Sequence, residues 1–267
     1  MKIALCCIIK NENKYFDEFI NHYLNFLKFD HIFIYDHNDP EGEVIKDYGE
    51  NVTVINFRGK PRPCQNLAYM DCYKNYLKNS EYDWCLFIDA DEYLYIPETN
   101  NDVKQFLELE KFKDVDEILI NWVNIQDNNL IRYDNRKLCE RFKDAEAWMD
   151  KGNRHTKPFL RCTSNVTSFR CPHVFFISSK KYCNTSGELK KSHAGLDGKF
   201  LENHKYAYLK HYTTKTIEEF LWKIDRGFPD GAKTSLNNFF GLNEDTPEKR
   251  DFIKKYYEKN INENKIN

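Results

Sequence analysis

The chain has 267 residues, 41% of them hydrophobic, and a formal net charge of −2 at pH 7. This length suits one large domain, or one domain with an appendage. Charges of both signs are mixed along the chain, which argues against an electrostatic nucleic-acid binder. The 10 glycines are too few for a collagen-like or linker-dominated chain. No stretch is long and apolar enough to span a membrane.

The nine cysteines predict reduced thiols rather than disulfides or a zinc site. Their number is odd, several lie inside apolar runs, and no two have the spacing Cys-x-x-Cys. Such thiols are typical of a cytosolic protein. The apolar start at residues 3–9 is cut off by polar residues 10–14, so it lacks the long apolar core of a signal peptide.

The first 88 residues alternate between short apolar runs and segments with apolar residues at helical spacing. This alternation predicts an α/β protein with a mainly parallel sheet flanked by helices. Neither a dinucleotide-binding glycine motif nor a P-loop motif is present. We expect strands at 3–9, 31–35, 52–55 and 84–88, and helices at 16–27 and 65–78.

The fourth predicted strand ends abruptly in the carboxylates Asp89, Asp91 and Glu92. An open α/β sheet binds its ligand outside the carboxyl ends of its strands. Asp89 and Asp91 are two residues apart, so they share a face in an extended chain. Paired carboxylates suit Mg²⁺ or Mn²⁺ and leave coordination positions for phosphate oxygens. The segment therefore predicts a metal site, with a solvated strand end as the alternative.

The second half has a looser pattern, which we interpret as a loop-rich, substrate-facing region over residues 126–204. Pro247, preceded by the capping residue Thr246, predicts the start of a terminal helix. The other elements expected here are helices at 102–109 and 216–226, strands at 117–123 and 206–212, and short β segments at 158–161, 166–170 and 173–177.

Four segments, taken together and in this order, resemble glycosyltransferases of the GT-A (Rossmann-like) fold, in particular the family 2-like and family 92-like group. The segments are Lys10-Asn11-Glu12 with Tyr15, Glu18 and Tyr23; Tyr35-Asp36-x-Asn38-Asp39; Ile88-Asp89-Ala90-Asp91-Glu92-Tyr93-Leu94; and His211-Tyr212-Thr213-Thr214-Lys215 with Glu219-Phe220 and Lys223-x-x-Arg226-Gly227.

The resemblance implies a single catalytic domain over residues 1–228 and a helical extension over 229–267. Residues 1–125 would form the nucleotide-binding half, and residues 126–228 the half that binds the acceptor and completes the metal site.

The resemblance also implies an activity, the transfer of a hexose from a nucleotide-diphosphate sugar to a glycan or lipid-linked saccharide, with an inverting outcome expected. UDP-hexose is the expected donor. A divalent cation between Asp91 and the phosphates would stabilise the leaving diphosphate. Asp89 would act through water or the ribose, and His211 is the implied third ligand. Because imidazole is a better ligand for Mn²⁺ than for Mg²⁺, we expect Mn²⁺ at this site.

Further polar residues near the predicted strand ends are candidates for the donor pocket. Lys215 is expected to contact the diphosphate, whereas Lys223 and Arg226 also suit an ordinary solvated helix face. The candidates for the nucleotide are Asn11, Glu12, Asp36, Arg58, Arg62, Gln65 and Asn66.

An inverting displacement needs a general base within hydrogen-bond reach of the acceptor hydroxyl. Asp150 is our first candidate for a catalytic residue, because the neighbouring Trp148 offers a flat face for a sugar ring. Glu92 and Glu146 are the rival bases. A solvated loop would equally explain Asp150, and core packing would explain the tryptophan.

Three other functions are compatible with the same sequence features. Two carboxylates also serve glycoside hydrolases, an Asp-x-Asp pair serves some phosphatases, and the many aromatic residues permit a non-catalytic sugar-binding module. We expect a cytoplasmic protein, with peripheral membrane contact left open for a lipid-linked acceptor.

Overall fold

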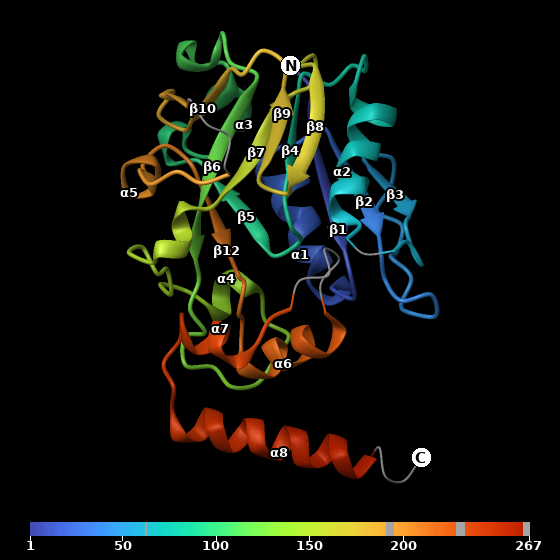
Figure 1. Ribbon diagram of the computed structural model, residues 1–267, viewed down its shortest axis with the longest axis vertical. Coiled ribbons are helices and arrows are strands. Elements are labelled where there is room, and N and C mark those ends of the chain that lie inside the picture. Colours follow the sequence, from blue (N-terminus) through green and yellow to red (C-terminus); the bar gives the residue numbers. More distant parts are fainter. Residues whose placement is uncertain (62, 191–194, 228–232, 264–267) are drawn as a thin grey trace.

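The computed structural model describes residues 1–61, 63–190, 195–227 and 233–263. They form an α/β protein with a mixed, mostly parallel central sheet flanked by helices (Figure 1). The strand order along the main path is β11-β10-β6-β7-β4-β1-β2-β3. The predicted α/β class is therefore confirmed.

Four neighbouring parallel strands of the sheet are the ones that the sequence predicts in its first half. β1 (Ile3–Ile9) lies between β2 (His31–Asp36) and β4 (Trp84–Phe87), and β3 (Val52–Asn56) extends the sheet beyond β2. Every residue of β1 and β4 is buried. Parallel strands are covered by helices on both faces, which is why these strands are continuous apolar runs rather than alternating ones.

The sheet changes direction at β7 (Thr156–Arg161), which runs antiparallel to both β4 and β6 (Glu117–Asn124). β10 (Tyr182–Asn184) pairs with β6 in parallel, and β11 (Leu189–Lys190) closes this edge. The looser second half of the sequence thus supplies central strands, which its short apolar segments predict only in part.

Two further strands branch from the main sheet at β6. They place the end of the last described strand at the candidate functional site. β12 (Tyr208–His211) pairs in parallel with β6 and antiparallel with β5 (Glu92–Tyr95). His211 therefore lies opposite Glu92 on one side and Asn124 on the other. β5 is absent from the sequence prediction, because residues 92–95 follow β4 without a turn signal.

Helices cover both faces of the sheet. The helical segment that contains α1 (Phe16–Ile20) continues as π-helical turns over Asn21–Phe26 and packs into one hydrophobic cluster with α3 (Val103–Leu107). α2 (Gln65–Cys72) packs into the other cluster. The hairpin of β8 (Val166–Cys171) and β9 (Val174–Ile177) belongs to this second cluster.

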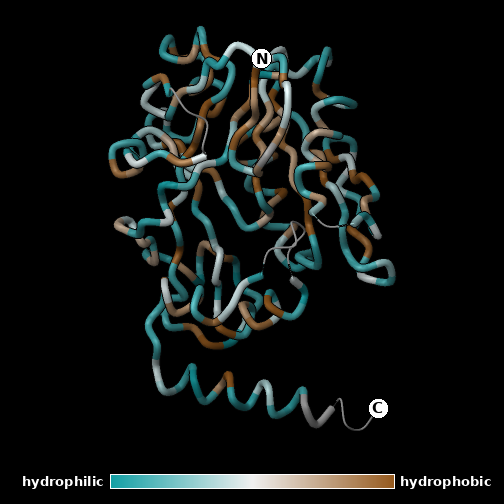
Figure 2. The backbone as a smooth tube through the Cα atoms, in the orientation of Figure 1, coloured by the Kyte–Doolittle hydropathy of each residue, from teal (hydrophilic) through white to brown (hydrophobic). Residues whose placement is uncertain are grey.

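The C-terminal helices form a third, smaller cluster below the sheet. α6 (Ile217–Arg226), α7 (Leu236–Phe240) and α8 (Pro247–Glu263) contribute to it, and α8 lies at the foot of the molecule (Figure 1). α8 is largely hydrophilic along its length (Figure 2). The Thr246 hydroxyl accepts a hydrogen bond from the Lys249 backbone, as the predicted cap requires.

A fully buried ion pair anchors α6 to the sheet domain. Arg141, at the end of α4 (Leu138–Arg141), donates to Glu219 at 2.7 and 3.0 Å, and neither side chain is more than 1% exposed. Tyr15 also donates to Glu219, and Glu219 completes the capping box of α6 with Thr216. The same helix carries Lys223 and Arg226, so this pair determines where two cations of the site lie.

All nine cysteines are free thiols, and most of them are buried. Within the described ranges, no helix has the length and apolarity needed to cross a membrane.

Candidate functional site

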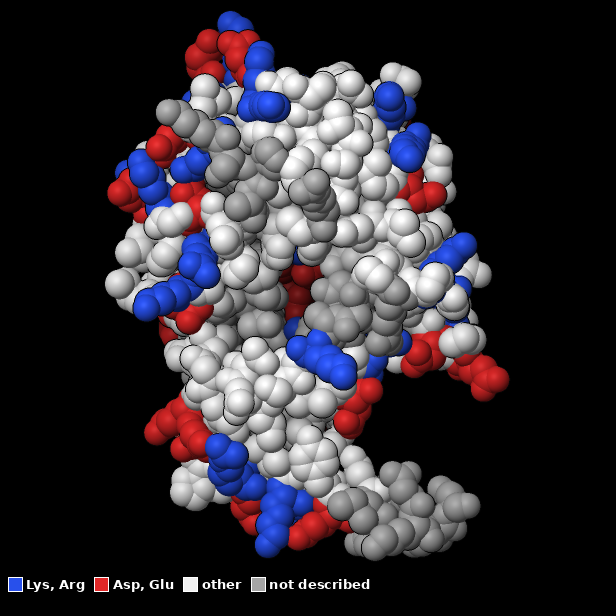
Figure 3. Space-filling model, in the orientation of Figure 1, with Lys and Arg blue, Asp and Glu red and all other residues white. Residues whose placement is uncertain are grey.

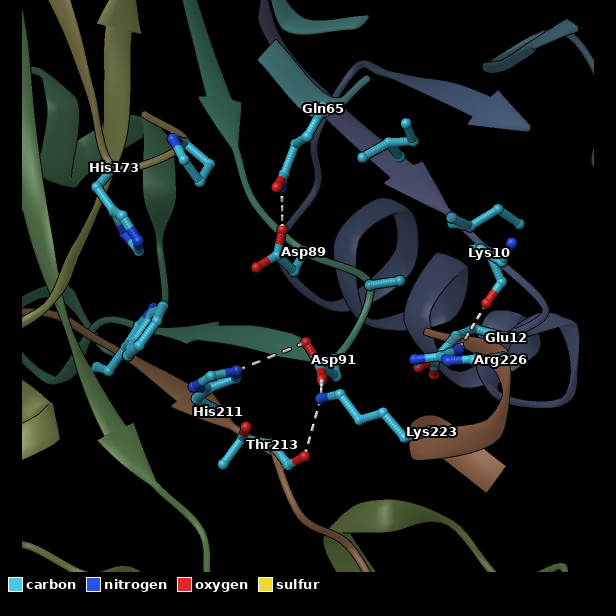
Figure 4. Close-up of a pocket in the computed structure, with 15 residues that line it drawn as sticks. Lys10, Glu12, Gln65, Asp89, Asp91, His173, His211, Thr213, Lys223 and Arg226 are labelled. Atoms are coloured by element: carbon cyan, nitrogen blue, oxygen red, sulfur yellow. Dashed lines mark hydrogen bonds and ion pairs between the residues drawn. The ribbon is translucent and has the colours of Figure 1, made fainter. Parts of the chain in front are cut away.

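A cavity of about 290 Å³ opens at the carboxyl ends of β1 and β4. Figure 3 shows it as a hollow near the centre of the molecule with acidic residues at its floor. The end of β12 and the helix α6 complete its wall (Figure 4). Among the described residues, its charged lining consists of three carboxylates and three cations, namely Glu12, Asp89, Asp91, Lys10, Lys223 and Arg226.

Asp91 is the carboxylate at which these elements meet. Its Oδ2 lies 3.0 Å from Lys223 Nζ, which also donates to the Thr213 carbonyl at 2.9 Å, and 4.0 Å from Lys215 Nζ. Burial would raise the pKa of Asp91, but the nearby lysines outweigh it and hold this pKa well below the usual range. Asp91 is therefore an ionised carboxylate at neutral pH although only 6% of the residue is exposed.

His211 faces the other oxygen of Asp91. Its Nε2 lies 3.7 Å from Asp91 Oδ1, and its Nδ1 lies 3.1 Å from the side-chain oxygen of Asn124. Burial lowers the pKa of His211 to about 3, so the imidazole is neutral near pH 7. Since Nδ1 must carry the proton to bond with an oxygen, Nε2 presents a lone pair to Asp91.

Asp89 occupies a separate position in the same cavity. Its Oδ2 accepts from Lys157 at 2.7 Å, and its Oδ1 accepts from Gln65. Burial would raise the pKa of Asp89, and the fully buried Lys157 lowers it below the usual value. Sequence reasoning predicts one metal site with the ligands Asp89, Asp91 and His211. The structure brings Asp91 and His211 together and places Asp89 with Lys157 and Gln65.

No group of three or more His, Cys, Asp and Glu side chains in the described part of the chain is arranged to hold a metal ion. The Asp91–His211 pair nevertheless fits a divalent cation in its chemistry, since it offers one carboxylate oxygen and one imidazole nitrogen lone pair. Mg²⁺ in nucleotide enzymes is usually bound by one or two carboxylates together with substrate phosphates, and imidazole suits Mn²⁺ better. A two-residue set completed by a phosphate is therefore chemically reasonable.

Glu92, one of the predicted catalytic residues, lies behind the cavity wall. Its side chain is fully buried, one carboxyl oxygen accepts from the Asp89 backbone at 3.0 Å, and the other lies 3.7 Å from Lys157 Nζ. Burial raises the pKa of Glu92 well above its usual value. Glu92 is absent from the cavity lining, and its contacts are with the Asp89 backbone and with Lys157.

Asp150, the first candidate base, also lies outside the cavity lining. It caps the short helical turn Lys151–Arg154 and accepts from the Asn124 side chain at 2.8 Å. The rival base Glu146 pairs with Lys210, and Trp148 packs against the rings of His204 and Tyr208. Among the described residues, Asn124 links Asp150 to the cavity, because its side chain also bonds with the lining residue His211.

Glu12 lines the cavity as predicted for a residue at the end of β1, and both Arg226 and Lys215 pair with it. Arg226 also donates to the Lys10 carbonyl at 2.5 Å. Lys215 has a φ of 54°, in the left-handed region that costs a non-glycine residue energy. Asn11 and Lys215 line an adjoining pocket of about 90 Å³ rather than the main cavity.

Asp36 lies at the end of β2 but does not line the cavity. It accepts from Arg58 at 2.9 Å, and Arg58 directs its remaining N–H groups to the backbone carbonyls of residues 39, 40, 42 and 43. The Asp36–Arg58 pair thus holds the loop of residues 39–43 in place. Gln65, in contrast, is part of the lining, and Arg62 is outside the described residues.

Sequence reasoning assigned no role to three residues that shape this site. Lys157 stands in the mostly buried strand β7, and its place directly before the predicted β segment 158–161 was the available signal. Trp122 and His173 also line the cavity. Figure 4 shows His173 on the side opposite Lys223. His173 bonds with the Thr156 carbonyl through Nδ1 at 2.8 Å, and burial lowers its pKa to about 4.

A comparison of the chain with protein-family models gives no match, and a comparison with curated proteins gives none either. The contacts and charges of the cavity are therefore the basis on which a function can be proposed for this chain.

Proposed function

We propose that the protein is a metal-dependent glycosyltransferase of the GT-A type, which transfers a hexose from a nucleotide-diphosphate sugar, with UDP-hexose as the first donor to test. The acceptor in this proposal is a glycan or a lipid-linked saccharide, and inversion at the sugar carbon is the expected outcome. The proposal includes a cytoplasmic location, with peripheral membrane contact for a lipid-linked acceptor.

The observation that carries this proposal is the facing pair of Asp91 and His211 at a strand end. Two electron-rich atoms, Asp91 Oδ1 and His211 Nε2, lie 3.7 Å apart in a cavity that also contains Lys223 and Arg226. Two facing lone pairs repel each other unless an electron-poor atom lies between them. A divalent cation is such an atom, and in this setting it would act as a Lewis acid on the diphosphate.

The charges of the lining support joint binding of metal and nucleotide. Each carboxylate of the lining already has a basic partner: Lys157 for Asp89, Lys215 and Arg226 for Glu12, and Lys223 for Asp91. A divalent cation alone would add two positive charges, and a diphosphate alone would add two or three negative ones. Since uncompensated charge is costly at buried positions, we expect the metal ion and the nucleoside diphosphate to bind much more tightly together than separately.

The described residues have distinct tasks in this proposal. Lys223 and Arg226, on consecutive turns of α6, are arranged to receive phosphate oxygens as charge-assisted donors. Gln65 and Lys157 hold Asp89 in one orientation, ready to accept a hydrogen bond from the donor. Trp122 lines the cavity and packs against the implied ligand His211, with ring centroids 4.2 Å apart. Glu92 and Asp150 both lie outside the cavity lining. A structure with a bound donor would identify the base.

Thermal unfolding with ligands tests the proposal. We expect UDP together with Mn²⁺ to raise the melting temperature by more than the sum of the separate shifts, because only the combination preserves the charge balance. Asp91→Asn should abolish this excess, while Asp36→Asn serves as the matched control at a strand end outside the cavity. The absence of any shift with UDP, GDP, CDP or TDP in the presence of metal would contradict the proposal.

Activity assays separate the other functions. Release of UDP from UDP-glucose or UDP-galactose in a metal-dependent reaction supports the transferase. Hydrolysis of aryl glycosides without nucleotide or metal would favour a glycoside hydrolase, and turnover of an aryl phosphate would favour a phosphatase. Metal-independent glycan binding with no turnover would favour a sugar-binding module.

A further inference from the structure

We infer that Asn124 is a positioning residue that fixes the tautomer of His211, and that Asp150 acts on the site through Asn124. The consequence for metal binding rests on the function proposed above, whereas the tautomer itself does not. Asp150, Asn124 and His211 come from different segments of the chain, and they form a continuous chain of hydrogen bonds that ends at the cavity.

The backbone holds Asn124 firmly beside His211. The two residues are register partners of the parallel strands β6 and β12. The Asn124 backbone N–H donates to the Asn153 side chain at 2.8 Å, and its backbone carbonyl accepts from Ala147 at 2.8 Å. Only 8% of Asn124 is exposed, so its side chain has little freedom to turn.

The partners of the Asn124 amide determine which of its ends faces His211. Asp150 Oδ1 lies 2.8 Å from one end of the amide, and the same oxygen also accepts from the Gly152 backbone at 2.8 Å. A carboxylate oxygen accepts hydrogen bonds, so the amide group that faces Asp150 is the NH₂. The amide oxygen must then face His211 Nδ1, which lies at 3.1 Å.

An amide oxygen only accepts, so the hydrogen bond requires the proton of His211 on Nδ1. In a neutral imidazole, Nε2 is then the unprotonated nitrogen, and it is directed at Asp91 Oδ1. In the other tautomer, Nε2–H would donate to Asp91 and close the pair, but the separation of 3.7 Å is longer than a hydrogen bond. The Asp150–Asn124 pair thus keeps the imidazole nitrogen available as a ligand.

This arrangement gives Asp150 a role that differs from the base suggested by the sequence. In metal sites, a hydrogen bond to the second nitrogen of a ligating histidine fixes its tautomer and orientation, and removing it typically weakens metal binding by about 10–100-fold. Asp150 would act one residue further from the metal ion, by holding the side-chain amide of Asn124 in one of its two orientations.

The test measures the tautomer directly, by nitrogen NMR of the protein labelled with ¹⁵N-histidine, with His211→Gln to assign the signals. The expected wild-type result is a protonated Nδ1 and an unprotonated Nε2 near pH 7. Asn124→Leu, which has a similar shape but no acceptor, should shift His211 toward the Nε2–H form. A wild-type spectrum with protonated Nε2 would overturn the inference, and this result needs neither a variant nor a metal.

Mn²⁺ affinity, measured by electron paramagnetic resonance with saturating UDP, gives the second readout. We expect Asn124→Leu to weaken it about 10–100-fold. Asp150→Asn keeps an acceptor for both Asn124 and Gly152, so it should preserve the tautomer and the affinity, whereas Asp150→Ala should lose part of both. An unchanged tautomer and affinity in Asn124→Leu would overturn the inference. If the wild type has the expected tautomer but binds no Mn²⁺, the proposed function fails while the tautomer assignment stands.

Discussion

Asp36 and Asp91 lie at the ends of two segments of the same parallel sheet, and both are almost buried, at 5% and 6% exposure. Each has a basic partner within 3.0 Å. Yet Asp36 shares its partner, Arg58, with the carbonyls of a loop, and it lies outside the cavity. Asp91 has one oxygen on Lys223 and the other facing a neutral imidazole inside the cavity.

The difference shows that burial and an ion pair do not by themselves decide whether a carboxylate faces the cavity. Asp36 binds an arginine whose other N–H groups hold the loop of residues 39–43. In Asp91 one oxygen faces an atom that cannot donate to it, which leaves a place for a ligand. We therefore expect substitutions at the two positions to separate stability from ligand binding.

The largest effect is expected for Asp91→Asn. The amide cannot replace the charge of the carboxylate toward a cation, so metal-dependent sugar transfer or donor hydrolysis should fall about 1000-fold. The measurement is the release of UDP from a UDP-hexose with and without Mn²⁺. Retention of metal-dependent UDP binding by Asp91→Asn would mean that the cavity does not use this carboxylate.

The next largest effect concerns the buried ion pair of Arg141 and Glu219, which lies outside the main cavity. Glu219→Gln leaves an arginine with no exposed side-chain surface without its countercharge. We expect the free energy of unfolding to fall by about 3–5 kcal/mol, measured by urea denaturation. The double variant Arg141→Met/Glu219→Gln should recover part of the loss. A loss below about 1 kcal/mol for Glu219→Gln would show that the pair is not what anchors α6.

A smaller effect is expected for Asp36→Asn, the counterpart of the Asp91 variant. The free energy of unfolding should fall by about 2 kcal/mol, because Arg58 loses a charged acceptor in a partly buried position. The affinity for UDP with Mn²⁺ should stay the same within error. Loss of nucleotide binding without loss of stability would reverse the comparison and make Asp36 part of the donor pocket.

The smallest effect concerns His22, a buried side chain whose imidazole is kept neutral instead of forming an ion pair. Burial lowers its pKa from 6.5 to about 4 in the folded protein. The unfolded chain therefore binds more protons between these values, and stability falls as the pH drops below 6.5. We expect a loss of about 1 kcal/mol at pH 5.5 from this residue. Urea denaturation from pH 7 to pH 5 should show a flatter profile for His22→Gln than for the wild type, and equal profiles would refute this.

Much of the fold was predictable because its causes are local. The buried strands β1, β2 and β4 are apolar runs, since parallel strands have both faces covered. Thr246 and Pro247 predict the start of α8 correctly, because capping depends on neighbouring residues. β5 was missed, since a strand of four residues directly after β4 is defined by its pairing with β12 rather than by its own pattern.

The candidate site was predictable only in part, for the same physical reason. A carboxylate pair after a buried strand predicted a metal site at this edge of the sheet. Asp89 and Asp91 both line the cavity there, and the binding of a metal ion stays a prediction. No sequence pattern could place Lys157 on Asp89, 68 residues away, or Lys223 on Asp91, 132 residues away. These contacts exist because β7 and α6 are brought to the same sheet edge.

By itself, the sequence determined the apolar strands, the helices between them and the acidic end of β4, because short-range periodicity and capping encode these features. Only the tertiary structure decided that Asp91 faces His211 while Asp89 faces Lys157, and that Asp150 is connected to the cavity through Asn124. Such partners are selected by strand register and close packing, which join residues far apart in the chain and leave no local pattern.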